Sequence, residues 1–179
     1  MTPPTAADYQ ARRVVVGTTD VGRSTIVEDG PATTRAVLPI CTVVDLWSVP
    51  SLPAVVEDPD SLDGNVALDP PPAGALVRMV TLPPDAEWKT SGGGFGESLS
   101  AMGGADAAAD DHDDSSGMHA TDTVDVIVVV SGEVYAVLED GETLLRPGDS
   151  LIQRGTKHAW SNRTDQPVTF VATMISAKS

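Results

Sequence analysis

The feature that most constrains this sequence is a series of short runs rich in Val, Ile, Leu and Thr, separated by Gly, Pro and Asp. Few segments show the i, i+3, i+4 apolar spacing of a surface helix. Two turns join neighbouring runs: Ser131-Gly132, and Asp140-Gly141, a dipeptide that favours a type I′ turn because both central residues tolerate positive φ. The chain is therefore predicted to be all-β, with strands at residues 13–17, 24–28, 41–48, 75–82, 123–130, 133–139, 142–145, 150–153, 158–162 and 168–175.

One domain is expected from the length of 179 residues and the hydrophobic content of 41%, which can form one substantial core but not two. No internal repeat is visible, so we expect a single barrel. Residues 75–179 are predicted to form the barrel core, and residues 1–74 to supply N-terminal strands and an extended arm that packs on it. Prolines in residues 49–74 cannot donate to a β-ladder, so this stretch is expected to be a long surface loop. The arm, together with the edge strands that an open barrel would expose, predicts a homodimer.

The charge balance excludes some classes of partner. The 11 basic and 26 acidic residues give a formal net charge of −15, which repels phosphate backbones and anionic lipid surfaces. Neither nucleic acid nor a membrane is an expected partner. No apolar run reaches the roughly 18 residues of a membrane helix, and the N-terminus lacks the pattern of a secretory signal. A cytoplasmic protein is therefore predicted.

A flexible acidic loop is expected at residues 91–117, where Gly, Ser, Ala and Asp dominate. Such a segment cannot bury enough apolar surface to offset the entropy that is lost on ordering. Its position before the last third of the chain leaves two interpretations open, a lid over a site or a passive linker.

Two motifs occupy the last third of the chain. Residues 117–132 read GMHATDTVDVIVVVSG, and residues 147–162 read PGDSLIQRGTKHAWSN. The first resembles the cupin motif G(X)5HXH(X)3,4E(X)6G, and the second resembles the cupin motif GDX4PXGX2HX3N. The second motif is one residue short between its Gly-Asp pair and the following Gly, and Arg154 stands where proline is usual. Because two motifs in the right order are more specific than either alone, the chain is identified as resembling a small cupin.

This resemblance implies a jelly-roll β-barrel and, in most cupins, a divalent ion held by three histidines and one glutamate. In this chain His119 takes the place of the first histidine and His158 that of the last. Thr121 replaces the second histidine and Asp125 replaces the glutamate, so the site is degenerate. His119, Asp125 and His158 still have the composition of a two-histidine, one-carboxylate site for Fe, Mn, Ni or Zn. The residues leave the presence of a metal open, and no nucleotide cofactor is expected.

Strand alternation predicts which side chains share an interior. His119, Thr121 and Asp125 have like parity, as do His158 and Trp160, so both histidines can line one pocket. His119 and His158 are the candidate catalytic groups. The candidate substrate-binding residues are Gln153, Arg154, Trp160 and Thr121.

Alternatives exist for several of these residues. Each histidine could be a hydrogen-bonded core residue, and Arg154 could instead form an ion pair with Asp125 or with an acidic surface. His112 could supply a further metal ligand or lie in a solvated loop. Asp149 is expected to cap the turn that follows Pro147-Gly148.

The functional prediction is an enzyme that acts on a small organic substrate, such as a carboxylate or an aromatic compound. The resemblance implies oxygenase, decarboxylase, isomerase or dehydratase chemistry, with a divalent metal ion as the cofactor of the family pattern. A metal-free lyase that uses histidine as acid and base, and a non-catalytic small-ligand-binding protein, are the alternatives.

Overall fold

The computed structural model describes residues 5–89, 94–108 and 117–178. Strands dominate this part of the chain, and all ten predicted strands are present. The short β3 is an additional strand. The elements are η1 (Ala6–Asp8), β1 (Arg12–Thr18), β2 (Ser24–Pro31), β3 (Arg35–Val37), β4 (Thr42–Val49), β5 (Ala75–Leu82), α1 (Asp85–Trp88), α2 (Phe95–Ala101), η3 (Ala105–Ala107), β6 (Thr123–Ser131), β7 (Val134–Leu138), β8 (Gly141–Leu145), β9 (Ser150–Arg154), β10 (His158–Ser161) and β11 (Val168–Ser176).

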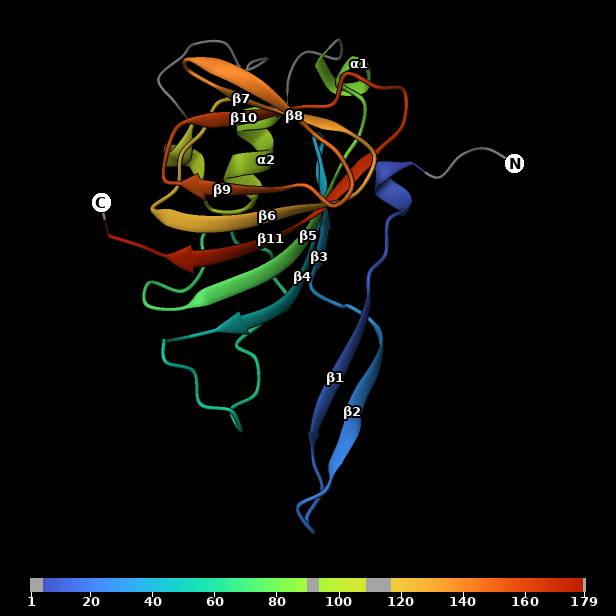
Figure 1. The fold of residues 1–179 in the computed structure, drawn as a ribbon, viewed down its shortest axis with the longest axis vertical. Coiled ribbons are helices and arrows are strands. Elements are labelled where there is room, and N and C mark those ends of the chain that lie inside the picture. Colours follow the sequence, from blue (N-terminus) through green and yellow to red (C-terminus); the bar gives the residue numbers. More distant parts are fainter. Residues whose placement is uncertain (1–4, 90–93, 109–116, 179) are drawn as a thin grey trace.

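Two antiparallel sheets form the barrel (Figure 1). The larger has six strands in the order β3-β4-β5-β11-β6-β9, and the smaller has three in the order β10-β7-β8. Apolar side chains from both sheets form one core between them, including Ile127 and Phe170 from the larger sheet and Val134 and Ala136 from the smaller. The prediction of an all-β jelly-roll barrel is confirmed.

Strands β3 and β4 belong to the barrel itself. They lie within residues 1–74, which the sequence assigns to strands and an arm that pack on the barrel core. Strand β4 pairs with β5 along most of its length, and Val43 and Val44 are buried. Residues 50–74, which contain the prolines, run from β4 back to β5 with an isolated bridge between Ser51 and Ala73. The barrel therefore begins well before residue 75.

Strands β1 and β2 form a separate hairpin that extends away from the barrel (Figure 1). At its base, Ala11 and Ala32 pack against Val44 and Met79 of the larger sheet. Farther out, its apolar side chains are exposed, and Val16 is 73% accessible to solvent. This hairpin is thus an extended arm whose sides carry uncovered apolar residues.

Part of the predicted flexible loop is helical. Helix α2 and the turn η3 lie within residues 91–117, whereas residues 91–93 and 109–116 lie outside the described residues. Phe95, Leu99 and Met102 recur at i, i+4, i+7 and form an apolar stripe that packs against Cys41 and Leu68. This stripe provides the buried apolar surface that orders the segment, although the overall composition of the segment is polar. None of the helices in the described ranges is long and apolar enough to cross a membrane.

Candidate functional site

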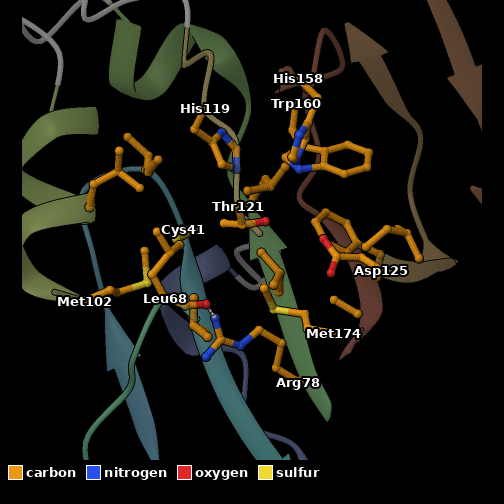
Figure 2. Close-up of a pocket in the computed structure, with 18 of the residues that line it drawn as sticks. Cys41, Leu68, Arg78, Met102, His119, Thr121, Asp125, His158, Trp160 and Met174 are labelled. Atoms are coloured by element: carbon orange, nitrogen blue, oxygen red, sulfur yellow. Dashed lines mark hydrogen bonds between the residues drawn. The ribbon is translucent and has the colours of Figure 1, made fainter. Parts of the chain in front are cut away.

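A cavity of about 120 Å³ lies inside the barrel. Most of its lining is apolar, and helix α2 contributes Phe95, Leu99 and Met102 to it. A cavity of somewhat larger volume in another protein holds benzene, so this one suits a compact small molecule. Its polar lining residues are Arg78, His119, Thr121, Asp125 and His158 (Figure 2).

Strand alternation brings these polar side chains inward. Along β6 the residues Thr123, Asp125 and Ile127 are buried, whereas their neighbours are more exposed. His158, the first residue of β10, is also buried. The structure thus places His119, Thr121, Asp125, His158 and Trp160, all predicted site residues, around one cavity.

The two histidines are direct neighbours across a β-bridge. The backbone N–H of each donates to the carbonyl oxygen of the other, at 2.9 Å in both cases. Their ring centroids are 4.3 Å apart and their planes are inclined by 48°. The bridge joins β10 of the smaller sheet to the segment that leads into β6 of the larger sheet, so it brings both sequence motifs together.

Each imidazole is held in one tautomer by a backbone carbonyl. The Nδ1 of His119 lies 3.0 Å from the carbonyl oxygen of Gly117, and the Nδ1 of His158 lies 3.0 Å from that of Thr156. A carbonyl oxygen can only accept a hydrogen bond, so Nδ1 carries the proton in both rings. In the neutral imidazole, Nε2 is then an unprotonated base.

Burial keeps both rings neutral. It lowers the pKa of His119 below its ordinary value of 6.5. The pKa of His158 falls to about 4, because of burial first and the proximity of His119 second. Near neutral pH the cavity therefore contains two unprotonated Nε2 atoms on adjacent side chains.

Aromatic rings surround the pair. Phe95 lies 5.7 Å from His119 between ring centroids, and Trp160 meets His158 edge-on at 5.6 Å. Trp160 in turn packs against Phe170 at 4.9 Å. These contacts fix the imidazoles and give the cavity aromatic walls.

Asp125 occupies a different part of the lining. Its carboxyl lies apart from the two imidazoles in Figure 2. Burial raises its pKa, an effect that a hydrogen bond from Thr123 partly offsets. The hydroxyls of Thr121 and Thr123 share a hydrogen bond of 2.7 Å.

The predicted three-residue metal site is not assembled. Within residues 5–89, 94–108 and 117–178, no three His, Cys, Asp or Glu side chains converge as a metal ion would require. Asp125 is one methylene shorter than the glutamate of the cupin motif, and Thr121 offers a hydroxyl that is already hydrogen-bonded. The described residues therefore do not fit a His119, Asp125, His158 ion site. His112, the further candidate ligand, lies outside the described residues.

Gln153 and Arg154 do not line the cavity. Gln153 is buried and its side-chain amide donates to the carbonyl oxygen and the hydroxyl of Thr156. Arg154 is exposed because alternation along β9 directs it outward. The prediction that these two residues bind substrate has no support in the pocket geometry. By contrast, the carboxylate of Asp149 accepts a bond of 2.9 Å from the backbone N–H of Arg146, as its place in the turn predicts.

Arg78 is a cavity residue that the sequence analysis missed. Its guanidinium donates to both carboxylate oxygens of Asp45, at 2.9 and 3.2 Å, and to the carbonyl oxygens of Ala67 and Leu68. Both charged side chains are buried. Through these bonds Arg78 links the irregular segment that precedes β5 to Asp45 of β4. The sequence does contain a signal for this ion pair, because each of the apolar runs 42–49 and 75–82 has one charged residue inside it, Asp45 and Arg78.

An all-β barrel with a small interior cavity and paired histidines is the class of protein that this fold and site define. Residues 110–174 match the family model described as Cupin domain. This match covers 65 of the 179 residues and contains both motifs that carry the resemblance to cupins.

Curated relatives match over short segments. Phomopsin biosynthesis cluster protein C′ of Diaporthe leptostromiformis is 48% identical over 48 residues, which are 26% of this chain and 25% of that protein. The cupin-domain-containing oxidoreductase srdB of Neurospora crassa is 38% identical over 65 residues, 35% of this chain and 33% of that protein. The matches thus span between a quarter and a third of these relatives.

Among solved structures, the cupin domain of Schizosaccharomyces pombe Cnp3 is similar at 8% identity and a TM-score of 0.46. That similarity covers 94% of this chain and 89% of the other.

Proposed function

We propose that this cupin is an enzyme that moves a proton on a small organic substrate, with His119 and His158 as its acid and base. The observation that carries the proposal is a pair of imidazoles, His158 buried and His119 half-buried, whose Nδ1 atoms are bound to carbonyl oxygens at 3.0 Å each. This arrangement leaves Nε2 of both rings available as a base in a cavity of small-molecule size. The oxidoreductase name of the Neurospora crassa relative supports an enzyme over a non-catalytic binding protein.

The step that fits the pair is removal of a proton from carbon next to a carbonyl group. Nε2 of one histidine takes the proton, and the C–H electron pair passes into the carbonyl as an enolate. The pair then carries one added proton, because a second positive charge 4.3 Å away in a buried site is unfavourable. In a substrate with a C=C bond next to the reacting carbon, return of this proton to the far carbon of that bond completes an isomerisation. Its delivery to a β-hydroxyl, with expulsion of water, completes a dehydration. No step requires a third ligand or an ion.

Solvent hydrogen exchange tests the proposal without knowledge of the natural substrate. The protein is incubated in D2O with cyclopentanone and with 4-hydroxy-2-butanone, and loss of the α-hydrogen signal is followed by NMR. We expect faster exchange for at least one probe, and a loss of about a hundredfold or more in His119→Gln and His158→Gln. Lys157→Gln is the matched control, because Lys157 is the exposed neighbour of His158 and pairs with Glu139 on the surface.

Elemental analysis of the same samples separates this proposal from metal-dependent chemistry. Exchange by a preparation without Fe, Mn, Ni or Zn supports the histidine mechanism. Exchange that requires a stoichiometric metal, or that persists in both histidine variants, contradicts it.

A cytoplasmic location and a homodimer are part of the proposal and rest on the sequence arguments given above.

A further inference from the structure

One atom in the cavity lacks a partner. Asp125 is 5% exposed, and its Oδ1 is buried without a hydrogen-bond donor. Among the described buried side chains, Thr42 Oγ1 is the other atom in this condition, and Thr42 does not line the cavity. Buried polar atoms in folded proteins almost always have a partner. An unpartnered acceptor that lines a cavity therefore indicates a donor that comes from a bound molecule or from water.

The neighbouring donors are already engaged. Arg78 donates to Asp45 and to two backbone carbonyls. The Thr121 and Thr123 hydroxyls share a bond with each other. The Nδ1–H groups of His119 and His158 are directed at carbonyls, which leaves an acceptor on the other side of each ring. The polar part of the cavity is consequently rich in acceptors.

We infer that the cavity takes a compact apolar molecule that bears a hydroxyl or amino group, and that Asp125 Oδ1 accepts a hydrogen bond from that group. This inference rests on the proposed function, because it concerns the same cavity, and it names the substrate class as small hydroxy or amino compounds. The apolar body faces Phe95, Trp160 and Phe170. A carboxylate is a poor ligand at this position, because it brings a further acceptor and a negative charge to Asp125.

Phenol and fluorobenzene form a matched pair of probes, since they have nearly the same size and shape and differ in the donor. Fluorobenzene binding is followed by 19F NMR, and phenol and benzoate are measured by competition against it. We expect phenol to bind the wild-type protein about tenfold more tightly than fluorobenzene. Benzoate is expected to bind no better than fluorobenzene.

Variants assign the preference to Asp125. Asp125→Leu is expected to bind both probes equally, whereas Asp125→Asn retains a carbonyl acceptor and part of the preference. Asp165→Leu, an identical change at an exposed position, should retain the wild-type preference. If Asp125→Leu does not fold, Asp125→Asn still tests the inference through the reduced preference.

Equal affinity of the wild-type protein for phenol and fluorobenzene would overturn the inference, because water alone would then satisfy Oδ1. Persistence of the full preference in Asp125→Leu would also overturn it. These binding results are independent of proton exchange. A preserved phenol preference without exchange refutes only the proposed function, whereas exchange without the preference refutes only the role of Asp125.

Discussion

Protonation of His158 should destabilise the folded protein. The pKa of this residue is about 4 in the folded state, against an ordinary value of 6.5 in the unfolded chain. Between these two values the unfolded chain binds more protons than the folded one, so stability is lost as the pH falls. Each pKa unit corresponds to about 1.4 kcal/mol, so a difference of this size costs about 3 kcal/mol by pH 4.

The contribution of His158 is isolated by comparing pH dependences. Urea unfolding is measured at pH 7.5 and 4.5 for the wild-type protein, His158→Gln and Lys157→Gln. Between these pH values the wild-type free energy of unfolding should fall by about 2 to 3 kcal/mol more than that of His158→Gln. Lys157→Gln should follow the wild type, because lysine does not titrate in this range. An NMR titration of the His158 imidazole with a midpoint near its ordinary value, or equal slopes for wild type and His158→Gln, would refute the reasoning.

Three further predictions concern the ion pair, the helix and the hairpin. Asp45→Ala should lower the free energy of unfolding by about 3 to 5 kcal/mol, because it leaves the buried Arg78 without its partner. The double variant Asp45→Leu/Arg78→Met should regain most of this loss in urea unfolding, and failure to do so would show that the carbonyl bonds of Arg78 dominate. Leu99→Ala should cost about 2 to 3 kcal/mol, because Leu99 is buried in the core under α2. A change below about 0.5 kcal/mol would show that α2 does not pack stably on the barrel. The wild-type protein should sediment as a dimer and Val16→Lys as a monomer, because the hairpin carries the exposed apolar surface that a second copy would cover. A wild-type protein that sediments as a monomer throughout the micromolar range would contradict this prediction.

The barrel could be predicted because its strands are local patterns. Alternating apolar residues and the turn signal near Asp140-Gly141 predict β7 and β8 without knowledge of any distant contact. The predicted type I′ turn is wrong in detail, because Leu138 pairs with Gly141 and only Gly141, not Asp140, has a positive φ. The histidines could be placed because each lies in a motif of fixed spacing. Their approach to 4.3 Å follows from a bridge between segments almost 40 residues apart, which the spacing within either motif does not specify.

Other features depend on contacts that the sequence does not display. Helix α2 is stabilised by the barrel residues that its apolar stripe covers, so composition alone suggested a loop. Arg154 was assigned to the pocket because it adjoins a motif, although its outward direction follows from its position on β9. The assignment of Asp125 as a metal ligand rested on its position in the motif and on its charge, and neither determines whether a shorter side chain reaches the histidines.

The β-bridge between His119 and His158 provides an internal reporter of the site. The amide hydrogens of these residues form the two bonds that connect the edge of the smaller sheet to the segment entering β6, each with an N···O distance of 2.9 Å. Any motion that separates the imidazoles by opening this bridge must break both hydrogen bonds and expose both amides to solvent. The exchange rates of two backbone protons therefore measure how often the barrel opens at its chemical centre, and a bound ligand that contacts both rings should slow them together.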